Sequence, residues 1–307
     1  MSDALDTPRR FTRRKWLRKW QETITFSRLM QPDDLPGRRR TRLLALGPVR
    51  RPVFVLGSPR SGTTYLGTLL SAIPGASYYF EPPILKYYAR LIYEGEVPTR
   101  RARLLYSSVF RVLRLVAPGR GLRVIEKNPN HTWIAETLAT FFPDARFVMI
   151  VRNGRDTALS LLEKPWHRRD SAGSGRFEPG GYPYGPYPHF YIERNRRQEY
   201  SAADDITRCA WVWRRHTEEL LRLQESLPPG TWHVLRYEEL LKNPDRTLHE
   251  LLSFLEADTP ESRIAVNEVA ASGHRDSIGR WRKQLTAADV EQVDREAGSL
   301  LRRLGYE

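Results

Sequence analysis

A short segment with two glycines and one arginine has the composition of an anion-binding turn. The segment is Gly57-Ser-Pro-Arg-Ser-Gly-Thr-Thr64, and it stands between an apolar run at 52–56 and a helical pattern at 63–73. Glycines let backbone amides point inward at an anion, and the helix N-terminus adds its partial positive charge. The segment therefore predicts a phosphate-binding loop, with an ordinary turn between a strand and a helix as the alternative.

This loop differs from loops that bind nucleoside triphosphates with magnesium. Thr63 replaces the lysine that usually follows the second glycine, and the positive charge stands earlier, at Arg60. A second apolar run, 146–151, ends in Arg152, where such enzymes need an aspartate to hold Mg²⁺. Because an arginine repels a metal ion but suits a further phosphate, the two turns predict an anion site that needs no metal.

The composition indicates a globular protein with an excess of positive charge. Of 307 residues, 50 are Lys or Arg and 36 are Asp or Glu, which gives a net charge of +14. This excess favours nucleotides, anionic membrane surfaces or nucleic acid as partners, or it solvates an arginine-rich surface. Cys209 is the single cysteine, so an intramolecular disulfide and a cysteine-rich zinc site are excluded, and we expect it to be buried.

Apolar and amphipathic runs alternate along the chain. They predict strands at 52–56, 123–126, 146–151 and 232–237, and helices at 63–73, from 83 to about 115, and at 133–142, 203–224 and 246–255. This alternation is typical of parallel βαβ units. We therefore expect an α/β fold: a single P-loop-type domain over residues 51–307, with three αβα layers and a central parallel sheet.

Residues 1–50 form a basic extension. Within it, Trp16, Leu17, Trp20 and Ile24 recur at helical spacing among arginines and lysines. A basic helix of this kind lies on an anionic bilayer or docks its rings on the protein's own core, and both alternatives stay open. The chain has no run of 18 apolar residues and no apolar signal-peptide core. We expect a cytoplasmic protein, with peripheral contact at the inner membrane face as an alternative.

Residues 165–200 interleave glycine and proline with tyrosine and phenylalanine. A loop of this length inside a compact domain is usually a lid, a binding loop or disordered. Its aromatic content favours a lid over a bound substrate.

Several motifs, in order along the chain, resemble those of sulfotransferases that use 3′-phosphoadenosine-5′-phosphosulfate (PAPS). Pro59-Arg-Ser-Gly-Thr-Thr64 is similar to the loop that holds the 5′-phosphosulfate, especially in tyrosylprotein sulfotransferases and related bacterial enzymes. Val151-Arg-Asn-Gly-Arg-Asp156 with Ser160 matches the motif that holds the 3′-phosphate. Further agreement is found in Glu126-Lys-Asn-Pro-Asn-His131, Arg236-Tyr-Glu-Glu-Leu-Leu241 and Gly279-Arg-Trp-Arg282. The first 50 residues and 165–200 lie outside the resemblance.

The resemblance implies a set of donor-binding residues. The set is Arg60, Ser61, Gly62, Thr63, Thr64, Tyr65, Arg152, Ser160, Tyr237, Arg275 and Arg280. Arg152 and Ser160 would hold the 3′-phosphate by hydrogen bonds, with the last two arginines as clamps; Arg152 in an ion pair at the sheet edge is the alternative. The residues from 60 to 64 would surround the 5′-phosphosulfate. Tyr65 and Tyr237 would contact adenine, although Tyr65 equally fits a core position.

The implied chemistry is in-line displacement at sulfur, helped by a base at the acceptor and cations at the leaving oxygen. Glu81 is the first candidate base, because an acidic residue in this region has that role in the resembled enzymes; a helix-start carboxylate is the alternative. Neighbouring aromatic and proline residues are a reason to expect a pKa raised by desolvation. His131 is the competing base. Lys127 matches a family lysine near the leaving oxygen, or it pairs with Glu126 or Asp144.

We therefore expect sulfation of a hydroxyl or amine with PAPS as co-substrate and without a metal. Two other functions stay open: a phosphotransferase (kinase) that uses Mg²⁺ and ATP, and a non-enzymatic binder of anionic surfaces or nucleic acid. The first needs a metal-holding carboxylate that the sequence does not place, and the second leaves the ordered motifs unexplained. The acceptor is a small molecule, a carbohydrate or lipid-linked; no nucleic-acid partner is expected, and a homo-oligomer is an open alternative.

Overall fold

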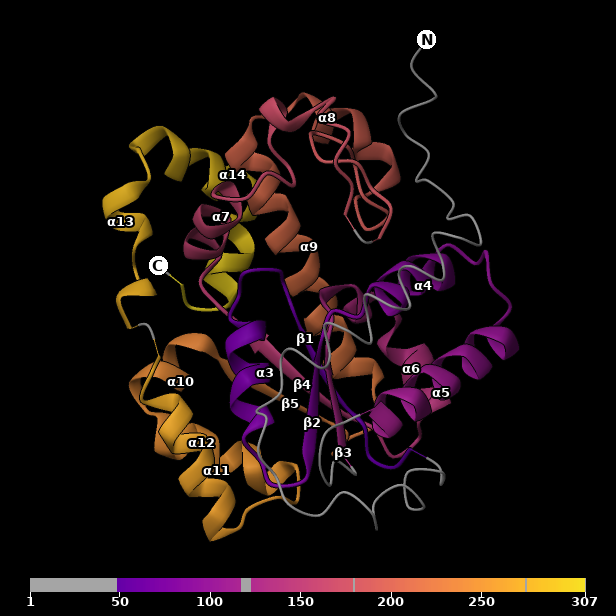
Figure 1. The fold of residues 1–307 in the computed structure, drawn as a ribbon. Coiled ribbons are helices and arrows are strands. Elements are labelled where there is room, and N and C mark those ends of the chain that lie inside the picture. Colours follow the sequence, from indigo (N-terminus) through magenta and orange to yellow (C-terminus); the bar gives the residue numbers. More distant parts are fainter. Residues whose placement is uncertain (1–48, 117–122, 179, 274, 307) are drawn as a thin grey trace.

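The computed structural model describes residues 49–116, 123–178, 180–273 and 275–306. In this part of the chain, five parallel strands form one sheet in the order β2-β3-β1-β4-β5 (Figure 1). They are β1 (Val53–Gly57), β2 (Ala76–Phe80), β3 (Arg123–Lys127), β4 (Arg146–Val151) and β5 (Trp232–Arg236). Because β2 and β3 lie on one side of β1 and β4 and β5 on the other, strand order reverses at β1. Parallel sheets bind ligands at such a point, beyond the carboxyl ends of the strands.

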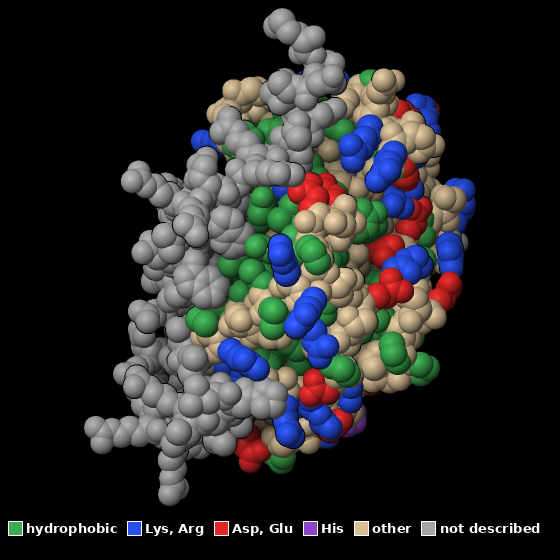
Figure 2. All heavy atoms as spheres, turned by 90° about the vertical axis from the view of Figure 1, so that its right-hand side faces the viewer, with side chains coloured by type: hydrophobic (Ala, Val, Ile, Leu, Met, Phe, Trp, Pro, Cys, Tyr) green, Lys and Arg blue, Asp and Glu red, His purple; other side chains and the backbone are tan. Residues whose placement is uncertain are grey.

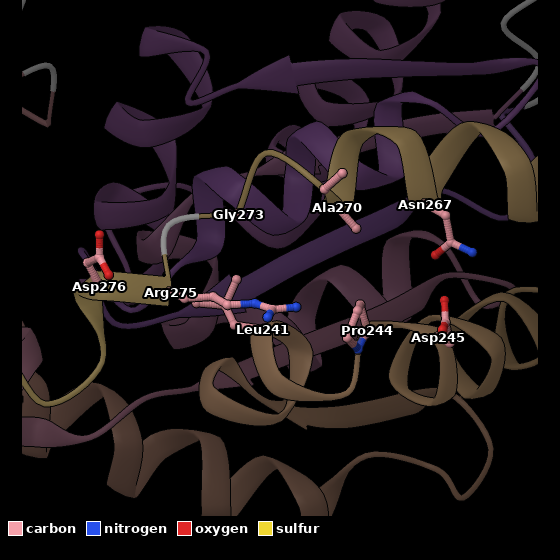
Figure 3. Close-up of a pocket in the computed structure, with 9 residues that line it drawn as sticks. Leu241, Pro244, Asp245, Asn267, Ala270, Gly273, Arg275 and Asp276 are labelled. Atoms are coloured by element: carbon pink, nitrogen blue, oxygen red, sulfur yellow. The ribbon is translucent and has the colours of Figure 1, made fainter.

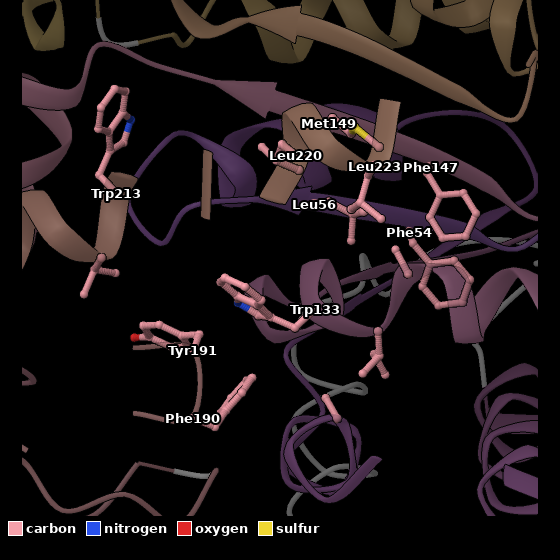
Figure 4. Close-up of a cluster of buried hydrophobic side chains, with 14 of the residues drawn as sticks. Phe54, Leu56, Trp133, Phe147, Met149, Phe190, Tyr191, Trp213, Leu220 and Leu223 are labelled. Atoms are coloured by element: carbon pink, nitrogen blue, oxygen red, sulfur yellow. The ribbon is translucent and has the colours of Figure 1, made fainter. Parts of the chain in front are cut away.

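Strands β1 and β4 are apolar because helices cover them on both faces of the sheet. Successive side chains of β1 point to opposite faces: Phe54 and Leu56 enter one core, which Figure 4 shows, and Val53 and Val55 enter the other. Phe54 pairs in register with Phe147 of β4, and their rings stack with centroids 5.5 Å apart. This packing fixes the ends of β1 and β4 beside each other.

Helices cover both faces of the sheet. The face of Phe54 is covered by α4 (Pro83–Tyr93), α5 (Thr99–Val116), α6 (Ala135–Phe141), α7 (Gly154–Leu162), α9 (Asp205–Ser226) and α14 (Ala287–Arg303). The other face is covered by α3 (Thr63–Ser71), α10 (Tyr237–Lys242), α11 (Pro244–Phe254) and α12 (Pro260–Ala270). The short helices α8 (Arg197–Ala202) and α13 (Trp281–Gln284) complete the α-helices of the described residues. The predicted α/β fold with a central parallel sheet is confirmed.

Several elements differ from the prediction, among them α10 and α12, which lie where the sequence indicated no helix. Strand β2 lies where the sequence indicated only a connection, and the helix expected from 83 to about 115 is two helices. Gly95 ends the first of them with φ +73°, a conformation that favours glycine. The helix expected at 133–142 begins as a 3₁₀ helix, η1 (Pro129–Ile134), and continues as α6.

The 165–200 segment packs its aromatic side chains into the protein. Tyr182, Phe190 and Tyr191 are buried in the same core as Phe54. Tyr191 stacks on Trp133 of η1, with ring centroids 5.6 Å apart. The segment therefore lies over α4 and η1, and its role as a lid stays a prediction.

The helix α5 has a basic outer side. Arg100, Arg101, Arg103 and Arg111 are exposed there, next to Leu104 at 63% exposure. Figure 2 shows the face that includes α4 and α5, where hydrophobic and charged side chains are interspersed. In the described part of the chain no helix has the length and apolar character needed to cross a membrane. The predicted N-terminal basic helix lies outside the described residues, and Cys209 is buried as expected.

Candidate active site

The predicted phosphate loop joins β1 to α3. Gly62 precedes the first turn of α3 with φ +96°, and a Cβ at this position would lie 2.3 Å from the ring of Tyr237. Only glycine fits both the backbone and this close contact. Arg60, also in the loop, has φ +68°, which is uncommon for a residue with a side chain. The loop is therefore held in a special conformation at the N-terminus of a helix, as an anion site requires.

The two predicted arginine turns meet at the ends of β1 and β4. Arg60 Nε donates to Ser160 Oγ over 3.1 Å, and Arg152 donates to the backbone oxygen of Arg60 over 3.2 Å. Burial lowers the pKa of the Arg60 guanidinium, and the charge of Arg152 adds to this effect. Arg152 Nε is buried without a hydrogen-bond partner. A buried cation with an unused donor fits a phosphate group.

Tyr237 and Tyr65 line the same region. The guanidinium of Arg152 lies 4.6 Å from the ring centroid of Tyr237, whose hydroxyl is 2.8 Å from Ser277 Oγ. Tyr65 meets Tyr237 edge-on, with centroids 6.4 Å apart, and its hydroxyl donates to the backbone oxygen of Ala270 over 3.1 Å. Tyr65 is half-buried, so the core and ligand-facing alternatives both stay open.

The C-terminal segment reaches Arg152 through a residue that the sequence did not indicate. Arg152 donates to the backbone oxygen of Ser277 over 2.5 Å. The predicted clamps have other positions: Arg280 pairs with Glu163, while Arg275 is exposed and lines a cavity of about 430 Å³ between α12 and the α10–α11 turn (Figure 3). The structure thus brings neither clamp into hydrogen-bond contact with Arg152, and their role stays a prediction.

Glu81 is held between two lysines directly after β2. Lys127 Nζ lies 2.6 Å from one carboxylate oxygen, and Lys86 Nζ of α4 lies 3.2 Å from the other. The Glu81 backbone has φ +41° and donates its N–H to the oxygen of Lys127 over 2.8 Å. Backbone strain of this kind persists where surrounding structure enforces it, often at functional sites.

The pKa of Glu81 is lowered, contrary to the expectation from its apolar neighbours. Burial raises the pKa of this carboxyl, but the charges and hydrogen bonds of Lys86 and Lys127 outweigh burial and lower it to about 2. The sequence indicated Lys127 as a site residue, with Glu126 or Asp144 as its alternative partner, but Lys86 was not among the predicted site residues. The lysine five residues after Glu81 was a signal, because it lies one helical turn into α4.

His131 lies in the core and not in the site. Its Nδ1 is 2.7 Å from Glu126 Oε2, and its Nε2 is 3.0 Å from the hydroxyl of Tyr106. The side chain is fully buried and meets the ring of Phe54 edge-on. With both ring nitrogens engaged inside the core, this placement does not favour His131 as the base.

The parallel sheet lies between two layers of helices. A glycine loop follows its central strand, β1, and Arg152 follows the neighbouring strand, β4. Together these features define a P-loop-like fold with an anion site. The model of the sulfotransferase family matches residues 52–175 and 189–261, and the chain belongs to this family.

Curated relatives and solved structures are similar at low identity. An omega-hydroxy-beta-dihydromenaquinone-9 sulfotransferase of Mycobacterium tuberculosis is 24% identical over 222 residues, which cover 69% of this chain and 48% of that protein. The nodulation protein NoeE of Sinorhizobium fredii is 26% identical over 296 residues, covering 83% of this chain and 65% of that protein. The crystal structure of sulfotransferase STF9 from Mycobacterium avium has a TM-score of 0.53 at 18% identity, covering 98% of this chain and 88% of that one. The chain spans between 31% and 48% of the length of the first curated relatives it matches.

Proposed function

We propose that the chain transfers a sulfuryl group from PAPS to a hydroxyl or amine acceptor. One observation carries this proposal: Arg60, Ser160 and Arg152 come together beside the glycine loop, and Arg152 keeps one buried donor unpaired. Membership of the sulfotransferase family supports the same assignment.

The donor-binding residues fit a nucleotide with phosphate groups at both ends. A 3′-phosphate carries about −1.5 to −2 charges near pH 7. Arg152 and Ser160 would bind it with charge-assisted hydrogen bonds. The amides at the start of α3, with Arg60, would bind the 5′-phosphosulfate. Tyr237, whose ring lies against Gly62, would contact the adenosine.

The transfer itself needs a proton acceptor and a cation at the leaving oxygen. The acceptor atom bonds to sulfur, the bond from sulfur to the bridging oxygen breaks, and Glu81 takes the acceptor's proton. While Lys127 is bound to it, Glu81 is a weak base, because its pKa is about 2. If Lys127 turns to the bridging oxygen when the donor binds, it stabilises the leaving group and makes Glu81 more basic in the same movement.

A phosphotransferase that uses magnesium and ATP is less well supported by the same geometry. The carboxylate nearest in sequence to Arg152 is Asp156, which accepts hydrogen bonds from the backbone N–H groups of Gly279 and Trp281 at 2.7 and 3.0 Å. Glu81 is held by two lysines. Both carboxylates are therefore engaged with the chain's own donors.

The test measures binding first and transfer second. Calorimetry with adenosine 3′,5′-bisphosphate should show binding that does not need Mg²⁺ and that weakens in Arg152→Gln. Radiolabelled PAPS is then offered to a phenol, a sugar, an amine and a long-chain alcohol. We expect Glu81→Gln to lose about 100-fold or more of the turnover, in the range of general-base contributions, and His131→Gln to retain it if circular dichroism shows it folded. Absence of bisphosphate binding, or binding of ATP only with Mg²⁺, would contradict the proposal.

A further inference from the structure

A row of charged side chains links the 165–200 segment to Glu81. Lys127 and Lys86 flank Glu81 at 2.6 and 3.2 Å, and Lys86 Nζ also lies 3.6 Å from Glu178 Oε2. The other oxygen of Glu178 is 3.6 Å from Nε2 of His189. Two carboxylates thus share one lysine, and the second carboxylate comes from the segment predicted to be a lid.

The position of Glu178 is fixed by its own turn. Its backbone N–H donates to the oxygen of Tyr182 over 2.8 Å, and its oxygen accepts from the N–H of Gly181 over 2.9 Å. Its side chain is 11% exposed, and that of Lys86 is 14% exposed. Carboxylates so poorly exposed are stable only when a cation or hydrogen bonds compensate for lost hydration.

Lys86 is the cation that balances Glu178. Burial, with the nearby charge of Lys86, lowers the pKa of His189 to about 3, so this imidazole is neutral at ordinary pH. Burial also lowers the pKa of Lys86, but Glu81 and Glu178 together outweigh it and raise the pKa. The ammonium therefore stays charged and divides its attraction between two carboxylates.

We propose that Glu178 is a positioning residue for the base: it draws the ammonium of Lys86 partly away from Glu81 and so leaves Glu81 able to accept the acceptor's proton. The inference rests on the proposed role of Glu81 in sulfuryl transfer. It makes the 165–200 segment part of the catalytic setting, since Glu178 of this segment lies next to Lys86 of α4.

Other charged groups near Glu81 come from the sheet and the loop. Lys127 belongs to β3 and Arg60 to the phosphate loop, while Tyr78 of β2 and Glu126 of β3 interact with the charge of Glu81 without a hydrogen bond to it. When PAPS binds, Lys127 and Arg60 have phosphosulfate oxygens as new partners. Lys86 then remains the closest cation to Glu81, and Glu178 becomes the group that limits its effect.

A double-mutant cycle tests this inference. In Glu178→Gln the ammonium of Lys86 no longer interacts with the Glu178 carboxylate, so it lowers the pKa of Glu81 further. We expect turnover to drop about three- to tenfold, because the base weakens by up to about one pKa unit. The KM for PAPS and the affinity for adenosine 3′,5′-bisphosphate should stay within about twofold. In a Lys86→Met background, Glu178→Gln should change turnover by less than about twofold, because the lysine through which it acts is gone.

The matched control removes another carboxylate that ties the same segment to α4. Glu94 accepts a hydrogen bond from the hydroxyl of Tyr182 over 3.2 Å. Glu94→Gln loosens this contact about two helical turns from Lys86 and should leave turnover within about twofold of the wild type. A merely structural role for Glu178 would instead give similar losses in both variants.

The assay measures the transfer of labelled sulfate from PAPS to the best acceptor of the panel, or the hydrolysis of PAPS by water. Equal losses from Glu178→Gln with and without Lys86, or no loss at all, would overturn the inference while the wild type remains active. If the wild-type protein neither transfers sulfate to an acceptor nor hydrolyses PAPS, the proposed function is refuted and this inference with it.

Discussion

At the scale of single residues, the pKa of Glu81 sets how the site responds to pH. Burial alone would raise the pKa of this carboxyl, and two lysines bring it to about 2. Since the folded pKa lies below the usual value of 4.5, the ion pairs stabilise the fold fully above about pH 4.5. That contribution is lost as the pH falls from about 4.5 towards 2.

Removing Lys86 should move the acid limb of the rate profile. In Lys86→Met one cation is absent, so burial raises the pKa of Glu81 above its wild-type value, and protonation stops catalysis at a higher pH. We expect kcat/KM of the wild type to be nearly constant down to about pH 5 and that of the variant to decline at higher pH. Sulfate release measured from pH 4.5 to 8.5 checks this. A limb that stays in place would mean that Lys86 does not control the base.

Gly62 is required by a contact as well as by its backbone. In Gly62→Ala the new methyl group would lie 2.3 Å from Tyr237 at φ +96°, so the loop or the ring has to move. Gly95→Ala is a matched control, because Gly95 has φ +73° and open space around it. Each variant should lose about 1 kcal/mol of stability from its backbone. We expect only Gly62→Ala to lose affinity for adenosine 3′,5′-bisphosphate, by about tenfold or more in calorimetry.

At the scale of elements, packing decides which expectations were met. The runs at 52–56 and 146–151 predicted β1 and β4 because strands covered on both faces are wholly apolar. Strand β2 was missed because Ser77, Tyr78 and Tyr79 lack such a run, and it pairs with β3 alone at the edge of the sheet. Its side chains are buried by helices on the two faces of the sheet, Tyr79 in one core and Tyr78 in the other, and no local pattern shows this packing.

The sequence predicted those residues of the site that belong to recognisable local motifs. The two turns between a strand and a helix predicted Arg60 and Arg152 as parts of an anion site, and the family resemblance added Ser160 beside Arg152. Ser277 and Glu178 were not predicted, because each reaches the site from a segment without periodicity, more than 90 residues along the chain from its partner. Long-range contacts of this kind follow from how loops pack, not from residue spacing.

The contact between α7 and α9 fixes the helix that carries Ser160. A Cβ at Gly154, the first residue of α7, would lie 2.6 Å from the indole of Trp213 in α9. Overpacking of this kind costs about 1–3 kcal/mol. Gly154→Ala should therefore lower the free energy of unfolding by that amount and weaken bisphosphate binding, because α7 shifts.

Gly298→Ala is the opposite case within α14. A Cβ there meets only the end of the Arg302 side chain at 3.4 Å and the Cβ of Asp294 at 3.6 Å. Since alanine favours the helix over glycine, we expect a gain of about 0.5–1 kcal/mol. Urea denaturation of both variants checks the pair. A neutral Gly154→Ala would show that the end of α7 adapts to the larger side chain.

At the scale of the whole molecule, the net charge of +14 gave little information about the ligand. Arginines of the 165–200 segment and of α9 pair with carboxylates: Arg196 with Glu296 of α14, and Arg214 with Glu193, Glu218 and Glu296. These cations link α9 and the 165–200 segment to each other and to α14, on one face of the sheet. Arg152 combines a buried donor that has no hydrogen-bond partner with a position at the end of β4 beside the glycine loop. This combination depends on the fold and not on the number of arginines.

A ligand bound at Arg152 should stabilise the whole domain, since this residue joins the loop, β4 and the C-terminal segment. Adenosine 3′,5′-bisphosphate at about 100 times its Kd should add ~2.7 kcal/mol to the free energy of unfolding, which raises Tm by about 5 °C for a domain of this size. Adenosine 5′-monophosphate, which lacks the 3′-phosphate, should give a smaller shift at the same concentration.

In Arg152→Gln the bisphosphate shift should fall to that of the monophosphate, whereas Arg100→Gln, at an exposed arginine of α5, should keep it. Added Mg²⁺ or EDTA should leave all shifts unchanged if, as we propose, arginine and backbone amides neutralise the phosphates. Equal shifts from both nucleotides in the wild type would place the 3′-phosphate away from Arg152 and remove the physical basis of the donor assignment.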